Sequence, residues 1–334
     1  MDKREALVLV DAYSQIFRSF YAIRMLTNSK GEPVNALFVF IKLLLQLEEK
    51  YPSRYGAMLF DCGKVAFRLN LNPEYKANRP PMPAALKSQI PLIREAASAF
   101  GWELIQHEDF EADDLIGGMC GKYSGMPVEI VSSDKDLSQL IDDRVSMLIP
   151  GSGGGFERRG TEEVLSKFGV PPSQIIDFLA LIGDNADNIP GVPGIGPKSA
   201  AEILHLWGDV EKWLDTPDML DPNHKYAKKL LPNLEIIRKN RELIRLRTGL
   251  PEKLDVPLPP ERREPDWQKI AEICRKNQLK SILKQLPEIP ETAPESGEED
   301  EYDLFSFAGK QDVGKGEAVK NSREEEFGVQ GELF

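Results

Sequence analysis

Cysteine and histidine are scarce in this chain, which contains only three of each among 334 residues. Cys62, Cys120 and Cys274 form no Cys-x-x-Cys pair and the histidines are scattered, which argues against both a zinc site and a disulfide framework. No run of about 18 apolar residues occurs, and the N-terminus leads into a predicted strand instead of a signal peptide. We therefore expect a protein of the reducing cytoplasm without a membrane span.

Carboxylates, by contrast, follow several predicted strands. The apolar runs 6–10 and 55–60 lead directly into Asp11 and Asp61, and the run 127–131 is separated from Asp134 by two serines. Because the carboxyl ends of parallel strands share one edge of an α/β sheet, these side chains are expected to meet there. Two further pairs of carboxylates are spaced three residues apart, so that each pair shares one helix face. The nine candidates are Asp11, Asp61, Glu111, Asp113, Asp114, Asp134, Asp136, Asp184 and Asp187.

Nine like charges in one crevice would raise each other's pKa unless a cation neutralises them. Every candidate ligand is a hard oxygen, which favours Mg²⁺ or Mn²⁺. Any single aspartate could instead be a turn residue or a helix N-cap, as Asp114 and Asp136 each could. Coincidence of the whole set is the poorer explanation, so the sequence predicts a metal pocket.

The net charge of −12 is unevenly distributed along the chain. Residues 288–334 contain 14 acidic and 4 basic residues, a net charge of −10, which leaves −2 for residues 1–287. Without the nine candidate ligands this body carries +7. A basic body around an acidic pocket is the pattern expected of a protein that binds phosphate and holds metal.

Strand and helix patterns alternate to about residue 150, which predicts an α/β core at 1–160 with a central, mostly parallel sheet and flanking helices. The predicted strands are 6–11, 55–61, 102–106, 127–132 and 144–149, and the predicted helices are 13–24, 35–50, 83–100 and 111–124. After a glycine-rich loop at 151–155, a helical lobe is expected at 161–287, with helices near 161–168, 172–182, 198–206, 223–247 and 266–285. Residues 288–334 have the composition of a disordered acidic tail.

Two segments add positive charge and phosphate-binding backbone to the carboxylates. The proline-rich segment 67–83 carries Arg68, Lys76 and Arg79 shortly after Asp61, where cations suit an anion whose charge grows during phosphoryl transfer. A solvated basic loop is the alternative.

The second segment, 183–201, contains Gly191, Gly194 and Gly196 before a helix start and Lys198, and such a turn can direct N–H groups at a phosphate. A plain helix-hairpin connection is the commoner explanation of a Gly-x-Gly turn. Here Asp184 and Asp187 immediately precede the turn, which favours the phosphate-binding interpretation.

In combination these motifs resemble the 5′ nuclease domain of bacterial DNA polymerase I, within the flap endonuclease family, here as a standalone protein. The resemblance covers about residues 5–285 and rests on Val10-Asp-Ala-Tyr, Phe60-Asp, Tyr75-Lys-Ala-Asn-Arg79, Glu111-Ala-Asp-Asp114, Ser133-Asp-Lys-Asp-Leu137 and the glycine-rich segment from Gly183 to Lys198.

The resemblance implies a PIN-like fold with a helical arch at about 67–100 and a helix-three-turn-helix motif at about 187–206. It implies that the nine carboxylates hold two divalent ions and that Lys76 and Arg79 act on the scissile phosphate. Arg68, Tyr75, the three hairpin glycines and Lys198 are expected to bind DNA. Some members of the family also bind K⁺ at the hairpin, which this sequence permits.

The chain ends in Gln330-Gly-Glu-Leu333-Phe334, which resembles the peptide that docks bacterial proteins on the DNA sliding clamp. A weaker echo without the glutamine lies at 301–305, where stray apolar residues are the preferred explanation. A flexible tether with an apolar anchor would raise the local concentration of the protein at a primer junction. The alternative is that Leu333 and Phe334 pack within the chain or serve no purpose.

The sequence thus predicts a monomeric, magnesium-dependent 5′-3′ exonuclease and flap endonuclease of replication and repair. Its substrate would be DNA with a 5′ flap, nick or fork, bound with weak sequence preference and strong salt dependence. Two alternatives remain: a PIN-type ribonuclease, and a structure-specific DNA-binding module that does not cut.

Overall fold

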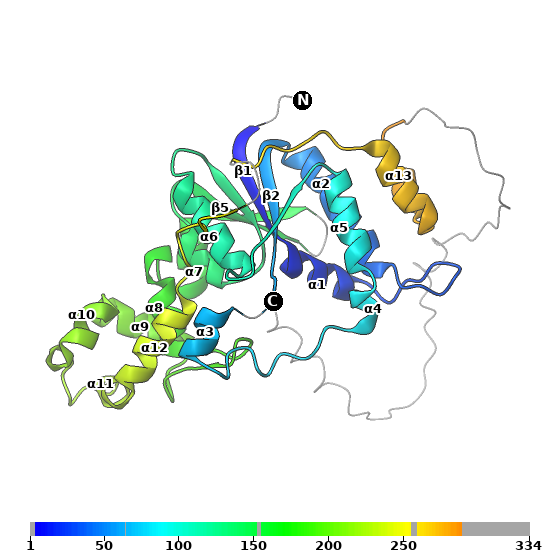
Figure 1. Ribbon diagram of the computed structural model, residues 1–334. Coiled ribbons are helices and arrows are strands. Elements are labelled where there is room, and N and C mark those ends of the chain that lie inside the picture. Colours follow the sequence, from blue (N-terminus) through cyan, green and yellow to red (C-terminus); the bar gives the residue numbers. More distant parts are fainter. Residues whose placement is uncertain (1–3, 64, 152–154, 255–258, 289–334) are drawn as a thin grey trace, which may run out of the picture.

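The computed structural model describes residues 4–63, 65–151, 155–254 and 259–288 (Figure 1). Its centre is a six-stranded sheet in the order β3-β2-β1-β4-β5-β6, parallel except for β6, which runs antiparallel to β5. The strands are β1 (Arg4–Asp11), β2 (Ser53–Phe60), β3 (Glu103–Gln106), β4 (Val128–Val131), β5 (Val145–Pro150) and β6 (Phe156–Arg159). The five predicted strands are confirmed, and β6 is an addition that the sequence did not predict.

The order of the strands reverses at β1. The chain moves outward from β1 through β2 to β3 and then returns to place β4 on the other side of β1. In sheets of this kind the crevice at the reversal, outside the carboxyl ends of the strands, is where ligands bind. Asp11 ends β1, and Asp134 follows β4 after two serines, so two predicted ligands flank this crevice.

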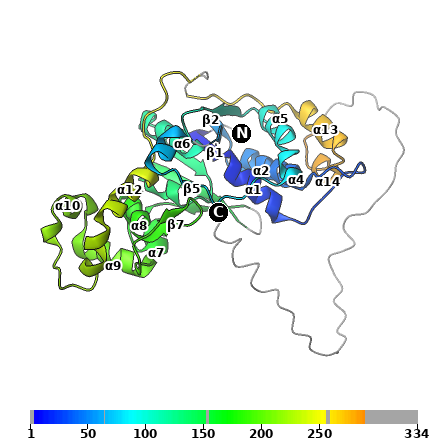
Figure 2. The same ribbon diagram turned by 60° about the horizontal axis from the view of Figure 1, so that its bottom comes forward.

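Each face of the sheet has its own hydrophobic core, because side chains alternate along the strands. Leu7 and Leu9 face α6 (Ala112–Lys122) and the helical lobe, whereas Val8 and Val10 face the opposite layer. That layer, visible in Figures 1 and 2, comprises α1 (Ala12–Ala22), α2 (Asn35–Lys50), α4 (Ala84–Lys87), α5 (Ile90–Ala99), α13 (Trp267–Lys276) and α14 (Lys280–Leu283).

The helical lobe extends from one end of the sheet (Figure 2). Its helices are α7 (Thr161–Phe168), α8 (Ile175–Ile182), α9 (Pro197–Trp207), α10 (Val210–Asp215), α11 (Ala227–Leu230) and α12 (Leu234–Ile244), and the short strands β7 (Gly183–Asp184) and β8 (Ile189–Pro190) form a hairpin between α8 and α9. The helix predicted at 223–247 is interrupted by a 3-10 turn at Leu231–Asn233, because Pro232 cannot continue an α-helix. None of the helices in the described part of the chain is long and apolar enough to cross a lipid bilayer.

The end of the predicted lobe lies elsewhere in the structure. Residues 260–286 return to the α/β core, where the N–H of Gly56 donates to Pro260 O over 2.9 Å and the N–H of Arg262 donates to Arg54 O over 2.8 Å. Helices α13 and α14 then pack on α5 and α2. The lobe that the sequence placed at 161–287 is therefore continuous only through α12.

The predicted helical arch is helical only at its ends. Helix α3 (Ala66–Leu71) precedes residues 72–83, which adopt no helix, and α4 and α5 follow them. Pro80, Pro81 and Pro83 prevent a continuous helix here, and Lys76 has a positive φ of 54°. The segment lies on the β7–β8 hairpin, to which the N–H of Lys76 donates at Asp187 O over 3.0 Å.

Candidate active site

Two carboxylates at the carboxyl edge of the sheet are fixed by hydrogen bonds to the surrounding helices and loops. Asp11 is the N-cap of α1: its Oδ1 accepts from the N–H of Ser14 over 3.1 Å, and its Oδ2 accepts from the Ser132 hydroxyl over 2.8 Å. Asp61, directly after β2, accepts from the N–H of Ala112 over 2.8 Å. Asp11 therefore caps a helix and also lies at the carboxylate edge of the sheet, so the two roles do not exclude each other.

The start of α6 contributes three more carboxylates. Glu111 is the N-cap and forms a capping box with Asp114, while Asp113 and Asp114 lie in the first helical turn. Glu111 and Asp114 are buried and Asp113 is partly buried. The negative side chains are favoured at this helix end by its partial positive charge.

The loop after β4 and the β7–β8 hairpin supply the rest. The hydroxyl of Ser132 accepts from the N–H of Asp134 over 3.1 Å, and Asp134 Oδ1 in turn accepts from the N–H of Asp136 over 2.9 Å. Asp136 Oδ1 is buried and accepts no hydrogen bond, which leaves a carboxylate oxygen available for a cation. Asp184, in β7, lies 3.1 Å from the ammonium of Lys135.

One group of carboxylates surrounds the end of β1. The pKa of Asp11 is raised to about 7 by burial and by the charges of Asp61 and Asp134. Burial and the charges of Asp134, Asp11 and Asp61 likewise hold the pKa of Asp113 well above its usual value. Asp11 and Asp113 therefore share an electrostatic environment that disfavours their ionised forms, and the charges of Asp61 and Asp134 contribute to it.

A second group shares Asp134 with the first. Burial raises the pKa of Asp134, as do the charges of Asp187 and Asp184. The pKa of Asp136 is raised well above its usual value by burial and by Asp134, Asp184 and Asp187. Within the described ranges no group of three or more acidic, histidine or cysteine side chains is already arranged to hold a metal ion. The carboxylate oxygens are of the type that binds Mg²⁺ or Mn²⁺, but they would have to move closer together to coordinate an ion.

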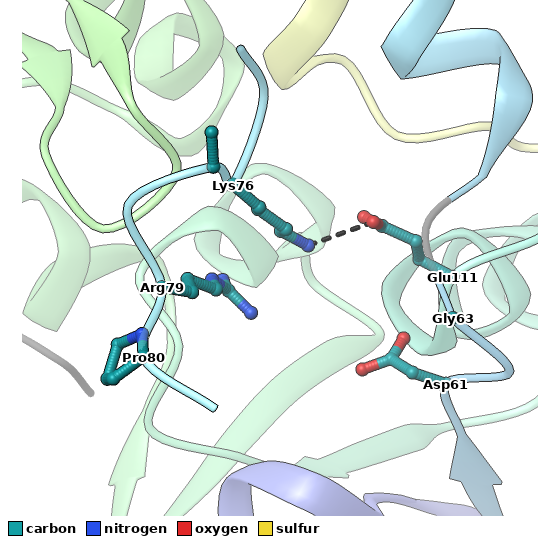
Figure 3. Close-up of a pocket in the computed structure, with 7 residues that line it drawn as sticks. Asp61, Gly63, Lys76, Arg79, Pro80 and Glu111 are labelled. Atoms are coloured by element: carbon teal, nitrogen blue, oxygen red, sulfur yellow. Dashed lines mark ion pairs between the residues drawn. The ribbon is translucent and has the colours of Figure 1, made fainter. Parts of the chain in front are cut away.

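Lys76 and Arg79, the cations of segment 72–83, face Asp61 and Glu111 across a pocket of about 320 Å³ (Figure 3). The Lys76 ammonium lies 2.9 Å from Glu111 Oε1 and 3.8 Å from Asp187 Oδ2, and Arg79 also pairs with Asp187. The Tyr75 hydroxyl lies 3.1 Å from Glu111 and 3.0 Å from Asp187 and can donate to either. Burial lowers the pKa of Lys76, but the charges of Asp187 and Glu111 outweigh that effect and raise it above its usual value. The pocket is lined by Asp61, Gly63, Lys76, Ala77, Arg79, Pro80 and Glu111.

Arg68 does not lie at the protein surface, where its predicted contact with DNA would require it. Its side chain is 2% exposed and forms a bidentate pair with Asp114, with N–O distances of 2.6 and 2.8 Å. Tyr75, also expected to contact DNA, belongs to segment 72–83, but its side chain is similarly buried. The structure therefore brings Arg68 and Asp114 to each other and not to the pocket surface.

The hairpin glycines serve different purposes. A Cβ on Gly191 would lie 2.2 Å from Ile182 O, so this glycine permits a close approach of two backbones. Gly194 has a φ of +74°, which favours glycine. Gly196 is the N-cap of α9, has open space around it, and is followed by exposed Lys198 in the first turn.

Two lysines that contact the site and the hairpin were not predicted from the sequence. Lys135 pairs with Asp184, and its position between two candidate ligands was the available sequence signal. Lys229, on α11, donates to Gly194 O over 2.7 Å and adds a cation to the hairpin. Its partner is 35 residues away, so no local pattern identifies it.

Other predictions fall on parts of the chain outside the described residues. These are the clamp-binding residues Gln330, Leu333 and Phe334, the echo at 301–305, nearly all of the predicted tail, and residues 152–154 of the glycine-rich loop. The prediction of a clamp contact therefore stays a prediction.

Comparisons with known proteins agree with the fold. The chain matches the 5′-3′ exonuclease N-terminal resolvase-like domain over residues 6–169 and the 5′-3′ exonuclease C-terminal SAM fold over residues 170–266. A 5′-3′ exonuclease of Aquifex aeolicus is 36% identical over 290 residues, which are 85% of this chain and 96% of that protein. DNA polymerase I of Rhizobium leguminosarum is 39% identical over 266 residues, which are 77% of this chain but 26% of the polymerase.

Among solved structures, the flap endonuclease of bacteriophage T5, in a pseudo-enzyme-product complex with DNA and metal ions, has a TM-score of 0.58 and 26% identity. The match covers 72% of this chain and 88% of that one. The predicted family and the predicted α/β core with a helical lobe are thus confirmed. From its matched domains and its relatives, the chain belongs to the 5′-3′ exonuclease family.

Proposed function

We propose that this nuclease hydrolyses DNA phosphodiesters at 5′ flaps, nicks and forks, as both exonuclease and endonuclease, in replication and repair. The observation that carries the proposal is the pair of carboxylate groups that share Asp134 at the strand reversal, opposite the cations of segment 72–83. The T5 flap endonuclease of the same fold was solved with DNA and metal ions, which supports both the substrate class and the requirement for metal.

Two divalent ions, Mg²⁺ or Mn²⁺, are assigned to the two groups. The first would be held by Asp11, Asp61, Glu111, Asp113 and Asp134, and the second by Asp134, Asp136, Asp184 and Asp187. The free, buried Oδ1 of Asp136 and the raised pKa values of Asp11, Asp113, Asp134 and Asp136 support this assignment, since both features call for a cation. When bound, the ions would lower the pKa of a water molecule and stabilise charge on the reacting phosphate. Asp114 is not in the set, because Arg68 and the N–H of Arg247 use both of its oxygens.

Lys76 and Arg79 are assigned to the scissile phosphate. Both belong to the pocket wall that faces Asp61, and both pair with acidic side chains that a metal ion would engage. If metal ions took the place of Lys76 and Arg79 as partners of these carboxylates, the two cations would become available to a phosphate. Tyr75 would hold the segment in place from below through Glu111 and Asp187.

The duplex is assigned to the β7–β8 hairpin and the start of α9. Close packing at Gly191 shapes the turn, and Lys198 and Lys229 supply charge beside it. A K⁺ ion at the hairpin carbonyls belongs to the same proposal. The Lys229 ammonium already donates to one of those carbonyls, that of Gly194, and would compete with the ion there.

Recruitment by the sliding clamp rests on the sequence Gln330 to Phe334 alone. Deleting these five residues should leave cleavage of short oligonucleotides intact and weaken association with purified clamp. Equal clamp binding by the full and shortened chains would contradict this part of the proposal. We further propose that the protein acts as a monomer in the cytoplasm, which sedimentation of the purified protein would check for the oligomeric state.

The deciding experiment is incubation of a 5′-labelled double-flap DNA with and without Mg²⁺. Wild-type protein should cut near the flap base only with metal, Asp134→Ala should bind without cutting, and Asp143→Ala, at an exposed position, should cut normally. No cutting by wild-type protein would favour a binding module. Preferential cutting of single-stranded RNA would favour a PIN-type ribonuclease.

A further inference from the structure

The pair formed by Arg68 and Asp114 lies where three parts of the molecule meet. Arg68 belongs to α3, at the root of segment 72–83, and Asp114 belongs to α6 in the α/β core. The Nε of Arg68 also donates to Leu243 O, in the last turn of α12, over 3.0 Å. Asp114 Oδ1 accepts from the N–H of Arg247, just after α12, over 3.1 Å. One ion pair thus joins the segment, the core and the lobe.

The pair is fully buried and nearly all its hydrogen-bonding groups are used. The Arg68 side chain is 2% exposed and that of Asp114 is 0% exposed. Burial opposes ionisation of Asp114, but its hydrogen bonds and the charges of Arg68 and Arg247 keep its pKa below the usual value. If Asp114 turned to a metal ion, the Arg68 charge would lose its closest partner in the interior, which is costly.

The same guanidinium touches the metal site through Glu111. Its Nη1 lies 3.2 Å from Glu111 Oε2, the oxygen that also lies 3.1 Å from the Tyr75 hydroxyl. The other oxygen of Glu111 pairs with Lys76. Arg68 and Tyr75 therefore share one oxygen of Glu111, while Lys76 holds the other.

We infer that Arg68, held by Asp114, is a positioning residue that fixes the lobe and segment 72–83 relative to the carboxylate edge, and so determines which phosphodiester is cut. This inference rests on the proposed function. The duplex would be held by the lobe and the reacting phosphate by the sheet edge, so the distance between them selects the bond. A planar guanidinium suits the role because it makes four contacts in fixed directions from α3 to two other elements, α6 and α12, which an ammonium cannot reproduce.

Arg68→Lys tests the inference, and Arg262→Lys is its matched control. Arg262 is also 2% exposed, pairs with Glu48 and donates to Phe100 O over 2.9 Å, but on the opposite side of the sheet from the lobe. Asp114→Asn is the third variant. Each is first checked for folding by circular dichroism at the assay temperature, because both lysine substitutions disturb a buried ion pair.

Two measurements follow: the length distribution of products from a double-flap substrate, and the number and affinity of Mn²⁺ sites by calorimetry without DNA. Arg68→Lys should spread the cut over neighbouring phosphodiesters and lower kcat roughly 10- to 100-fold with a smaller change in KM. Its Mn²⁺ affinity should fall roughly 10-fold, because Glu111 loses a neighbour that orients it. Asp114→Asn should behave likewise and keep both metal sites, whereas Arg262→Lys should match the wild type in both measurements.

Three outcomes would overturn the inference. The first is an Arg68→Lys protein that cuts at the wild-type position and binds Mn²⁺ normally. The second is an equal spread of products from Arg262→Lys, which would reduce the effect to lost stability. The third is loss of one metal site in Asp114→Asn alone, which would make Asp114 a ligand. Absence of cutting by the wild type would instead refute the proposed function, and the Mn²⁺ titration would still show whether Arg68 orients Glu111.

Discussion

The crowding of buried carboxylates predicts that metal-free protein loses stability as the pH rises. An acid whose pKa is raised on folding binds more protons in the folded than in the unfolded state, so the free energy of unfolding falls between the two pKa values. For Asp11 those values are 3.8 and about 7. The pKa values of Asp114 and Asp187 are lowered by their cationic partners despite burial, so these two groups affect the stability only at more acid pH. The loss should therefore occur between about pH 4 and pH 7.

The structure gives the size of this effect. Asp11 is 6% exposed, so little solvent screening applies. A pKa difference of about three corresponds to about 4 kcal/mol of unfolding free energy from this group. At about 2–4 °C per kcal/mol for a domain of this size, the whole loss corresponds to roughly 10 °C in the unfolding midpoint, and about two thirds of it falls between pH 5 and pH 8. Bound Mg²⁺ should restore much of it above pH 7, because an ion at 100 times its Kd adds about 2.7 kcal/mol.

The assay is thermal unfolding at pH 5 and pH 8, with EDTA and with Mg²⁺. Asp11→Asn removes the titrating charge and keeps an oxygen for the N–H of Ser14, so it should be more stable than the wild type at pH 8 in EDTA. Asp266→Asn is the control, since Asp266 is also a helix N-cap, accepting from the N–H of Lys269 over 2.9 Å, but outside the pocket. It should leave the pH dependence unchanged.

Two results would refute this reasoning. One is a metal-free wild-type protein as stable at pH 8 as at pH 5. The other is an Asp11→Asn protein that is less stable than the wild type at pH 8, which would mean that the hydrogen bonds of Asp11 outweigh the repulsion of its neighbours. A stabilising effect of Mg²⁺ that is no larger at pH 8 than at pH 5 would also contradict competition between protons and metal.

Three further predictions concern the DNA-binding surfaces. Lys76→Met should lower kcat roughly 100-fold with a smaller change in KM in steady-state cleavage, because a cation next to the reacting phosphate is lost; unchanged kcat would remove Lys76 from the reaction. Gly191→Ala should weaken duplex binding in a filter or anisotropy assay, because its Cβ would lie 2.2 Å from Ile182 O, whereas Gly125→Ala, with open space around it and outside the hairpin, should bind like the wild type. The logarithm of the binding constant for flap DNA should fall linearly with the logarithm of salt concentration, and a flat dependence would argue against phosphate contacts.

Much of the fold follows from local patterns. Apolar runs of strand length ending in Asp11, Asp61 and near Asp134 determine three strands, and their parallel alignment brings those aspartates to one edge. Pro232 was equally visible and shows why the long helix predicted at 223–247 is divided. The antiparallel β6 was missed because Phe156–Arg159 is short, carries three charged residues and has no apolar alternation.

Contacts between distant segments were beyond any local pattern. The return of residues 260–286 to the core depends on partners such as Gly56 and Gly101, which lie more than 150 residues earlier in the chain. Lys229 reaches Gly194 for a similar reason, since α11 folds back beside the hairpin. In both cases the sequence contains the donors and acceptors but no signal that pairs them.

The sequence by itself determined the chemical groups of the site: carboxylates at the carboxyl edge of a parallel sheet, with cations and a glycine-rich turn nearby. Only the tertiary structure decided which carboxylates lie among other acids and which are paired with a cation. Asp113 and Asp114 are neighbours of the same type, yet one faces the other acids of the pocket and the other is held by Arg68, 46 residues earlier. The reason is physical: the ionisation and partners of a buried charge depend on which groups surround it, and folding brings those groups from distant parts of the chain.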